Sequence, residues 1–464
     1  MDKKAQNSIL YTVLISQFTM PFMFSGIAIT LPIMGKEMSA SGVALSLVEI
    51  VFLGTSGALM LPFGKLADMT NKQAVYKTGL LSTALITLIL GFTQSIDLFI
   101  FFRFLQGLTF ALIVSTNMAI ITETIPKQQL GKAMGLSIGA VYAGLSVGPF
   151  IAGVLTEYVG WRWIYYIVCF MLLISFIQSA RYLKGKWVKP DKPYDYLGSI
   201  LIVSMLACWI IGSSKLNQGN IGIILLAIGV ALAPLLLIVE QKASSPLLEF
   251  RFLRTNLNFS KALIIQLLTY SGTFGVPFLF SLYLQTIKQF SPRDTGLILM
   301  TSPILMVLLA PFFGRLSDRI NPRRLATFGV TFTLIGTFLA TWISIDTSIY
   351  WLCLVLACHG IGFAMFSSPN MKIIMTSVDR TRTGVASALA AEMRTLGMVI
   401  SMLLITLFMS LIIGQTQISV DSAGLYLTVM RYSLIAITVL GGLAFVMSVF
   451  NQDKKATPLE VAEK

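Results

Sequence analysis

Long apolar stretches, separated by short polar segments, form the main hydrophobic pattern along this chain. A helix of about 20 predominantly apolar residues crosses the roughly 30 Å hydrocarbon core of a bilayer. The pattern therefore predicts an all-α integral membrane protein with about 14 transmembrane helices. The expected spans are 9–33, 43–66, 75–95, 98–122, 133–156, 163–183, 197–214, 221–239, 258–283, 295–313, 325–344, 350–375, 384–413 and 424–449.

Composition agrees with a chain that lies mostly in lipid. Of 464 residues, 56% are hydrophobic and 12% are charged, and the mean hydropathy is +0.82, whereas a soluble domain carries about 25% charged residues. All four cysteines fall inside expected spans, which favours packing over disulfides. The single histidine, His359, fits a packing position better than a titrating one, and we expect no metal site and no cofactor.

The positive charge is unevenly distributed along the chain. The net charge is +14. With an even number of spans, most lysines and arginines fall in the loops on the side of the two termini. This asymmetry follows the positive-inside rule and places both termini in the cytoplasm. The basic residues thus report orientation in a cell membrane, and we expect the lipid bilayer but no nucleic acid as a partner.

A short motif occurs twice. Gly64-Lys65-Leu66-Ala67-Asp68 ends the second expected span, and Gly314-Arg315-Leu316-Ser317-Asp318 ends the tenth. The copies lie further apart than the roughly 180–200 residues that six helices and short loops need. The surplus predicts a six-helix bundle in residues 1–190, a two-helix insert in 191–245, a second bundle in 246–450 and a cytoplasmic tail in 451–464. Such repeats are common in secondary transporters, whose substrate site lies near the bilayer midplane between the repeats.

The motifs together resemble the fourteen-span branch of the major facilitator superfamily, the drug:proton antiporters. Their order matches over nearly the whole chain. The resemblance implies a major facilitator fold and assigns three groups of residues. The gating group is Gly64, Asp68, Lys72, Gly314, Asp318, Arg319 and Arg323, the exporter motif of the fifth span is Gly144, Gly148, Pro149 and Gly153, and the intramembrane arginine motif is Arg103-x-x-Gln106-Gly107. Further matches are Trp161-Arg162-Trp163, Asp195-Tyr196-Leu197-Gly198 and Arg394-x-x-Gly397.

The sequence departs from this branch in two places. Met69, Asn71 and Gln73 replace residues that are usual in the first gating loop. The middle of the first span, 20–26, contains no acidic residue, although the branch often carries one there. A role in cation recognition for such a carboxylate therefore has no counterpart here.

Four ionisable side chains are expected at bilayer depth, where charge is costly, and they are the candidates for proton coupling: Glu49, Arg103, Glu392 and Arg394. At about 1.5 Å per residue, Glu49 and Arg103 lie at the same depth, so they are expected to form an ion pair, either structural or proton-coupling. Glu392 is the better candidate for the proton carrier, with a hydrogen-bonded structural carboxyl as the alternative. Arg394 follows two residues later and points to another face of the helix.

The remaining candidates concern gating and substrate binding. Asp68 and Asp318 are expected to pair with an arginine or a helix N-terminus and so to latch the outward-facing state shut on the cytoplasmic side, or else to be solvated loop charges. The span-five glycines permit close packing and Pro149 is expected to bend the helix; plain small-residue packing is the alternative. The expected substrate-binding residues are Phe22, Phe24, Phe52, Tyr142, Tyr270, Phe274 and Phe278.

These observations predict a monomeric secondary exporter in the cell membrane of a bacterium, which exchanges protons for a small amphipathic molecule. No Gly-x-x-x-x-Gly-Lys-Ser/Thr loop occurs, which excludes self-contained ATP drive. Open alternatives are an exporter of one metabolite, lipid or antibiotic, a uniporter and a channel. A membrane-embedded enzyme is disfavoured, because no zinc-protease motif, nucleophile elbow or paired intramembrane aspartates are present.

Overall fold

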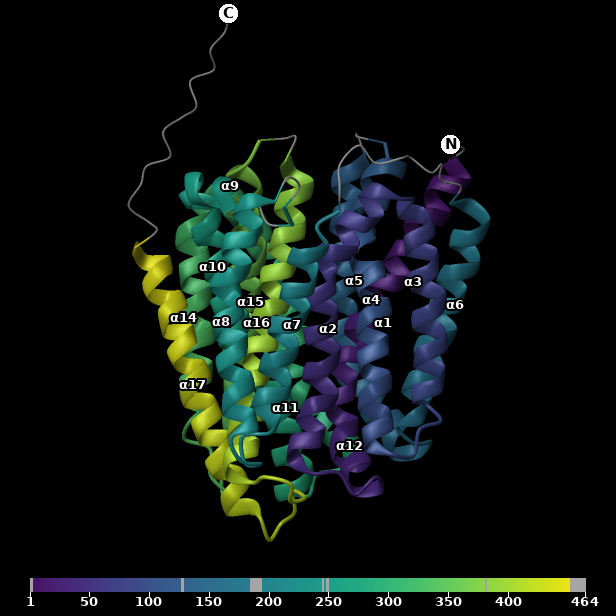
Figure 1. Cartoon of the computed structure of the whole chain (residues 1–464). Helices are drawn as coiled ribbons and strands as arrows, with labels where there is room; N and C mark the ends of the chain where they lie inside the picture. The colour runs from purple at the N-terminus through teal and green to yellow at the C-terminus, as the bar shows by residue number, and fades with distance from the viewer. Residues whose placement is uncertain are drawn as a thin grey trace, which may run out of the picture.

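A computed structural model describes residues 3–126, 129–183, 194–243, 246–247, 250–379 and 382–450, and within these ranges the regular structure is helical (Figure 1). Thirteen helical segments of this part are long and apolar enough to cross a membrane. The fourteenth expected span is a helix of 19 residues, Pro322–Ala340, whose first turn carries Arg323 and Arg324. The prediction of an all-α membrane protein is confirmed.

The amino-terminal helices form a compact group. They are α1 (Lys3–Glu37), α2 (Gly42–Met69), α3 (Lys72–Leu90), α4 (Ile96–Thr124), α5 (Leu130–Tyr158) and α6 (Arg162–Tyr182). Helix α1 packs on α5 and α6, α2 packs on α4, and α3 packs on α4 and α6. We call this group the N bundle.

The carboxy-terminal helices repeat the same pairings. They are α9 (Phe250–Thr255), α10 (Leu257–Ser271), α11 (Val276–Leu282), the π-helix η2 (Tyr283–Ile287), α12 (Pro292–Leu299), α13 (Thr301–Arg319), α14 (Pro322–Ala340), α15 (Ile349–Thr376), α16 (Thr383–Ile412) and α17 (Ala423–Phe450). Helix α10 packs on α16 and α17, α13 packs on α15, and α14 packs on α15 and α17. We call this group the C bundle. The domain boundaries stay predictions, because 184–193, 244–245 and the tail 451–464 lie outside the described residues.

Polar side chains at the loop ends determine where several helices begin. Ser41 accepts a hydrogen bond from the Ala44 amide at the start of α2, at 3.1 Å. Asn71 accepts from the Gln73 amide before α3, at 3.0 Å. These caps satisfy amides that have no partner inside their own helix. Loop residues thus fix the helix starts, while the apolar runs supply the helix length.

Two expected spans are interrupted. The span predicted at 258–283 splits after Ser271, at Gly272–Gly275, and continues as α11 and then η2. Pro277, in the first turn of α11, has no amide hydrogen to donate. The Gly275 amide donates instead to Ser401 Oγ of α16, at 3.0 Å. The span predicted at 295–313 likewise divides into α12 and α13 at Met300.

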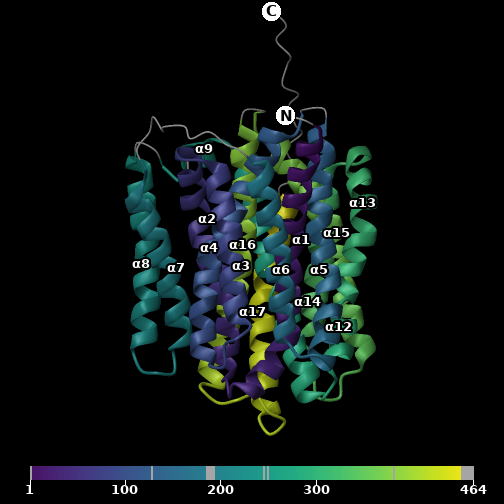
Figure 2. The ribbon, with the colours of Figure 1, turned by 90° about the vertical axis from the view of Figure 1, so that its right-hand side faces the viewer.

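The insert is a helical hairpin of α7 (Tyr196–Ser214) and α8 (Ile221–Lys242), which lies at one edge of the molecule (Figure 2). Helix α7 packs on α8, α2 and α16, so it contacts both bundles. The Tyr194 hydroxyl donates to the Pro62 carbonyl of α2, at 3.3 Å. Ser410 Oγ of α16 donates to the Ser214 carbonyl, at 3.2 Å.

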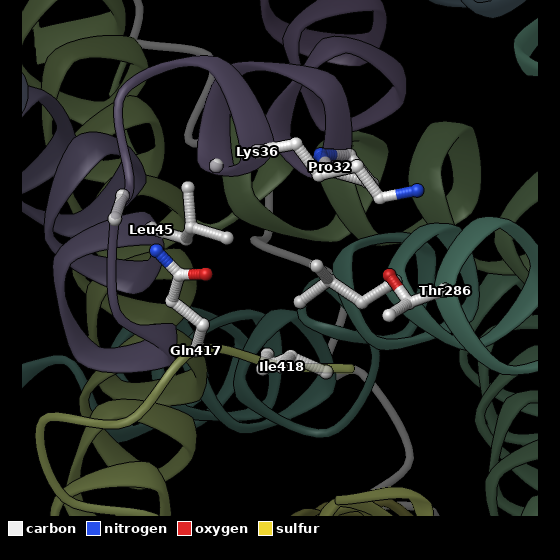
Figure 3. Close-up of a pocket in the computed structure, with 9 residues that line it drawn as sticks. Pro32, Lys36, Leu45, Thr286, Gln417 and Ile418 are labelled. Atoms are coloured by element: carbon white, nitrogen blue, oxygen red, sulfur yellow. The ribbon is translucent and has the colours of Figure 1, made fainter. Parts of the chain in front are cut away.

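The start of α1 and the end of α17 lie on the same side of the molecule, here the terminal side; the opposite side is the distal side (Figure 1). Hydrogen bonds join the bundles in the distal half. Ser281 Oγ donates to the Ala28 carbonyl, at 2.5 Å, and Gln285 Nε2 donates to the Ile29 carbonyl, at 2.8 Å. A small cleft opens at this distal seam, lined by Pro32, Lys36, Leu45, Thr286, Gln417 and Ile418 among others (Figure 3).

One face of α5 lies along the C bundle and shows where the two bundles separate. Residues 135, 139, 142, 146 and 153 share this face, because their spacings follow the helical period. Gly153 lies against the Pro292 carbonyl and Ser146 donates to the Pro303 carbonyl, at 2.9 Å. Closer to the terminal side, a Cβ added at Gly139 or Gly135 would meet nothing within 4 Å. The bundles therefore touch from the distal end to the middle and separate toward the terminal side.

Candidate functional site

Four polar side chains from both bundles meet at the point where the bundles separate. They are Tyr142 of α5, Tyr270 of α10, Ser367 of α15 and Arg394 of α16. The Tyr142 and Ser367 hydroxyls are 2.5 Å apart, and the Tyr270 hydroxyl hydrogen-bonds with Arg394 and Ser367. All four side chains are partly exposed, and each lies about 14–20 Å along its helix from the terminal-side end. We call these residues the central polar cluster.

Arg394 of this cluster has no acidic partner within the described part of the chain. Among the described residues, no carboxylate oxygen lies within 4.0 Å of its guanidinium. Glu392 is two positions away and points to another helix face, as the sequence predicts. The Gly397 backbone, one turn further along α16, packs on Tyr270, where an added Cβ would come within 2.9 Å of the Tyr270 Cβ. This close approach holds α10 and α16 together beside the cluster.

Aromatic side chains lie beside the cluster. The Phe24 ring of α1 packs edge-on against Phe274 of the C bundle and Phe52 of α2, with centroids 6.0 and 5.1 Å apart. Phe24 and Phe274 are partly buried, whereas Phe22, Phe52 and Phe278 are buried in the bundle cores. Of the seven expected substrate-binding residues, four therefore have exposed surface here: Phe24, Tyr142, Tyr270 and Phe274.

Arg103 occupies the interior of the N bundle and is fully buried. Its Nε donates to the Val48 carbonyl of α2, at 2.9 Å, and its Nη1 donates to Gln106 Oε1, at 2.7 Å. The guanidinium lies over the Phe52 ring, 4.4 Å from its centroid. Gln106 in turn donates to Thr87 Oγ1 of α3, at 2.7 Å. Arg103 thus ties α2, α3 and α4 together.

The expected ion pair between Glu49 and Arg103 is not formed in this conformation. The Glu49 side chain is 3% exposed, and its Oε2 has no hydrogen-bond partner. The charges of Glu49 and Arg103 still interact, together with the Tyr165 hydroxyl of α6. The two residues lie at one depth, as predicted, but Arg103 binds the Val48 carbonyl on the same helix as Glu49. The count of residues along each helix predicts only the depth of Glu49 and Arg103 in the membrane. The rotation of α2 about its own axis decides which of its groups meets the Arg103 guanidinium.

Glu392 is also 3% exposed, and its Oε2 has no hydrogen-bond partner. It shares a face of α16 with Thr395, which packs on Gly57 of α2; a Cβ added there would lie 3.0 Å from the Thr395 methyl carbon. On the same face toward the terminal side, Ala388 and Val385 are exposed. Glu392 is therefore the first buried residue along a face that is open on the terminal side.

The two gating motifs form equivalent contacts inside their own bundles. Lys72 bridges Asp68 and Glu123 of α4, with N–O distances of 3.1 and 2.7 Å. Asp318 pairs with Lys372 of α15 at 2.6 Å. In these ion pairs the partner of each aspartate is a lysine of the same bundle, whereas the sequence led us to expect an arginine or a helix N-terminus.

The other gating residues lie at the same helix ends. A Cβ added at Gly64 would lie 3.8 Å from Ser115 Cβ of α4, and one added at Gly314 would lie 3.3 Å from Ser368 Oγ of α15, which is a tight contact. Arg319 is exposed at the end of α13. The Arg323 amide, in the first turn of α14, donates to Oδ1 of the N-cap residue Asn321, at 2.9 Å.

The exporter-motif glycines bring α5 close to two helices. Gly144 and Gly148 lie directly on the backbone of α1 at Phe18 and Phe22. Gly153 lies on the Pro292 carbonyl, where an added Cβ would be 2.6 Å away, and the Pro149 carbonyl contacts Gly296 of α12. The motif therefore serves both the packing of the N bundle and the distal seam. Whether Pro149 bends α5 stays a prediction.

The lone histidine and the cysteines occupy packing positions. His359 is buried, and its Nε2 is 3.0 Å from the Thr337 hydroxyl of α14. The four cysteines are free. Within the described ranges, no three His, Cys, Asp or Glu side chains gather as a metal site.

Several partners were not identified from the sequence. Glu123 and Lys372 complete the gating contacts, Ser367 completes the central polar cluster, and Ser401 supports the break after α10. A charge at a helix end is a usable signal for Glu123 and Lys372, because each lies near the terminal-side end of its span. Ser367 and Ser401 give no such signal, since hydroxyls are common throughout membrane helices.

Comparison with known proteins agrees with this architecture. The chain matches the model of the Major Facilitator Superfamily over residues 13–402, and again over 262–463. It is 27% identical to the riboflavin transporter RibZ of Clostridioides difficile (strain 630) over 73% of this chain and 74% of that protein. It is also 27% identical to multidrug resistance protein 3 of Bacillus subtilis (strain 168), over 72% of this chain and 66% of that protein.

A third relative is the tetracenomycin C resistance and export protein of Streptomyces glaucescens. It is 23% identical, over 80% of this chain and 70% of the relative. The family match extends over most of the sequence, and the relatives are named as transport or resistance proteins. The chain belongs to the major facilitator superfamily and is a membrane transporter, not an enzyme.

Proposed function

We propose that this protein exports amphipathic organic compounds in exchange for protons. In this proposal it works as a monomer in the cell membrane of a bacterium, with both termini in the cytoplasm and no cofactor other than the coupling protons. Relatives named for multidrug resistance and tetracenomycin export support the direction and the class of compound. The aromatic surface at Phe24 and Phe274 supports binding of a ring system.

One observation carries proton coupling: Glu392 is buried between α16 and α2 and has no cationic partner among the described residues. An unpaired ionised carboxylate at bilayer depth is costly, so this conformation favours the protonated form. The exposed face of α16 at Ala388 and Val385 leads from Glu392 to the terminal side, so a proton that is loaded from the distal side can leave here toward the cytoplasm. Protonation therefore favours the conformation with a closed distal seam, and a bound proton shifts the population toward it.

The arrangement of the bundles supports alternating access. The distal seam is closed by backbone contacts at Gly153 and Gly296, and the terminal side is separated. With cytoplasmic termini, the central polar cluster is open to the cytoplasm in this state. Closing the terminal side and opening the distal seam delivers the bound compound to the outside. Gly153 lies where these contacts must break.

Proteoliposomes with an imposed pH gradient and an internal pH dye test the proposal. A panel of lipophilic dyes and antibiotics is added to the wild type, to Glu392→Gln and to Asp421→Asn, which removes an exposed loop carboxylate. Compound-evoked proton movement is expected in the wild type and in Asp421→Asn. We expect it to fall at least about tenfold in Glu392→Gln, since an amide cannot carry the proton.

The outcomes separate the alternatives. Proton movement that survives in Glu392→Gln assigns coupling to Glu49 and Arg103. Compound flux without proton movement in the wild type contradicts exchange and indicates a uniporter. Flux that does not saturate with compound concentration indicates a channel.

Export of a single metabolite is the second candidate. The relative named as a riboflavin transporter supports it. Including riboflavin in the same panel tests this alternative directly. Transport of riboflavin alone, with no dye or antibiotic carried, replaces the multidrug assignment.

A further inference from the structure

We infer that the central polar cluster selects amphipathic compounds that carry an anionic group, and that it rejects lipophilic cations. This inference rests on the proposed export function and names the substrate class of that same site. The anionic group binds Arg394 together with the hydroxyls of Tyr142, Tyr270 and Ser367. The ring system of the compound lies against the neighbouring aromatic side chains.

Donor groups dominate the cluster. A guanidinium has five N–H donors and no acceptor, and each hydroxyl adds one donor. Tyr270 satisfies part of this capacity, but no described carboxylate lies within 4.0 Å of Arg394. A carboxylate, sulfonate or phenolate accepts several of these hydrogen bonds at once, and charge-assisted bonds of this type are the strong ones. The cluster is therefore complementary to an anion.

The acidic side chains of the membrane interior are buried away from this site. Among the described residues, only Glu49 and Glu392 are acidic at mid-depth, and each is 3% exposed. Glu49 lies inside the N bundle and Glu392 lies in the contact with α2. The middle of α1, 20–26, contains no acidic residue. A cationic compound entering here meets Arg394 and, in the part of the chain that the structure describes, no exposed carboxylate at this depth.

The surroundings provide an apolar surface and an entrance. The Phe363 ring packs on Tyr270, with centroids 5.1 Å apart, and Phe274 lies about one helical turn beyond Tyr270. Gly139, about one turn from Tyr142 toward the terminal side, has open space beside it. A planar compound can thus approach from the terminal side and place its charged end at Arg394.

Two dyes that share a xanthene ring test the inference: sulfofluorescein, an anion, and rhodamine 123, a cation. Proteoliposomes with an acidic lumen are incubated with either dye and separated from free dye by gel filtration. The vesicles are then dissolved in detergent at one fixed pH, and the fluorescence of the retained dye is measured. Binding to purified protein is measured in parallel by fluorescence anisotropy. The proteins compared are the wild type, Arg394→Gln, Arg394→Lys and Lys215→Gln, which removes an exposed lysine from the α7–α8 turn.

We expect the wild type to bind and accumulate sulfofluorescein but not rhodamine 123. Arg394→Gln is expected to weaken sulfofluorescein binding at least about tenfold, the equivalent of one lost charge-assisted hydrogen bond. Arg394→Lys retains the charge but not the planar guanidinium, so its affinity for sulfofluorescein should fall less than that of Arg394→Gln. Lys215→Gln should bind like the wild type, which separates a local effect from a change in net charge.

Three results overturn the inference: rhodamine 123 is carried in preference to sulfofluorescein, neither dye binds, or sulfofluorescein binding is unchanged in both Arg394 variants. The first leaves the exporter proposal intact, because gradient-driven transport of a dye is still observed. Conversely, Arg394-dependent sulfofluorescein binding without gradient-driven accumulation supports anion selection and contradicts proton-driven export. The selectivity of the wild type alone decides the result if a variant does not fold.

Discussion

Two intramembrane arginines, Arg103 and Arg394, lie in different settings. Arg103 is fully buried, and its hydrogen bonds and its ring contact all stay within the N bundle. Arg394 is partly exposed and lies where side chains of both bundles meet. The same residue type thus stabilises one bundle in the first case and faces the space between bundles in the second.

The difference also extends to the nearby acids. Glu49 interacts with the charge of Arg103, whereas Glu392 has no cation beside it among the described residues. A buried acid next to a cation stabilises a fixed structure, because each charge offsets the desolvation of the other. A buried acid without a cation depends on protonation. The N bundle therefore carries the structural polar network, and the C bundle carries the proposed coupling site.

The largest expected effect is on stability. Arg103→Gln removes two charge-assisted hydrogen bonds and the contact with Phe52, and we expect a loss of about 2–4 kcal/mol. Arg394→Gln should change stability by less than about 1 kcal/mol, because its group is partly hydrated. Thermal unfolding of both variants in detergent measures the difference. Equal losses in the two variants contradict the comparison.

The two acids are expected to respond in opposite ways. Glu49→Gln leaves the Arg103 charge without compensation and should destabilise the protein by about 1–3 kcal/mol. Glu392→Gln should be neutral or slightly stabilising, because an unpaired buried acid is replaced by a neutral amide, while proton exchange is lost. Thermal unfolding and proton flux on the same preparations provide both readouts. A strongly destabilised Glu392→Gln shows that Glu392 has a structural partner.

A substitution that weakens the distal seam is expected to have an intermediate effect, measured as the accessibility of the distal cleft. Gly153→Val places carbon atoms against the Pro292 carbonyl and the Arg293 Cα, where even a Cβ would be 2.6 and 3.0 Å away, so the closed seam is destabilised. In a cysteine-free background with Thr286→Cys in the distal cleft, an impermeant maleimide added from the distal side should react several-fold faster. Gly139→Val is the matched control on the same helix face, with nothing within 4 Å of its Cβ. Equal reaction rates in both variants show that Gly153 does not hold the seam.

The smallest effects are expected at the terminal-side ion pairs. Lys72→Gln breaks two ion pairs and Lys372→Gln breaks one, and all of these are partly exposed to solvent. Each variant should therefore lose less than about 1 kcal/mol in thermal unfolding. Transport turnover is the more sensitive readout for gating. A destabilisation above about 2 kcal/mol in either variant shows a structural role at that helix end.

The sequence alone determined the number and depth of the helices. An unpaired backbone amide or carbonyl is costly in hydrocarbon, so a long apolar run has to form a helix, whatever its neighbours. The same reasoning placed Glu49, Arg103, Glu392 and Arg394 inside the membrane, because depth depends only on the count of residues along a helix. The repeated motif at Gly64 and Gly314 indicated the duplicated architecture.

Only the tertiary structure decided which side chains meet. Helix rotation brings the Val48 carbonyl, rather than the Glu49 carboxylate, to Arg103, and brings Tyr142 to Ser367 across the two bundles. It also buries Phe22 and exposes part of Phe24 on the same helix. Lipid and protein interior are both apolar, so a phenylalanine that faces lipid and one that faces a bundle core are alike in sequence. Contacts between helices depend on packing angles and distances, which the one-dimensional pattern of an apolar span does not contain.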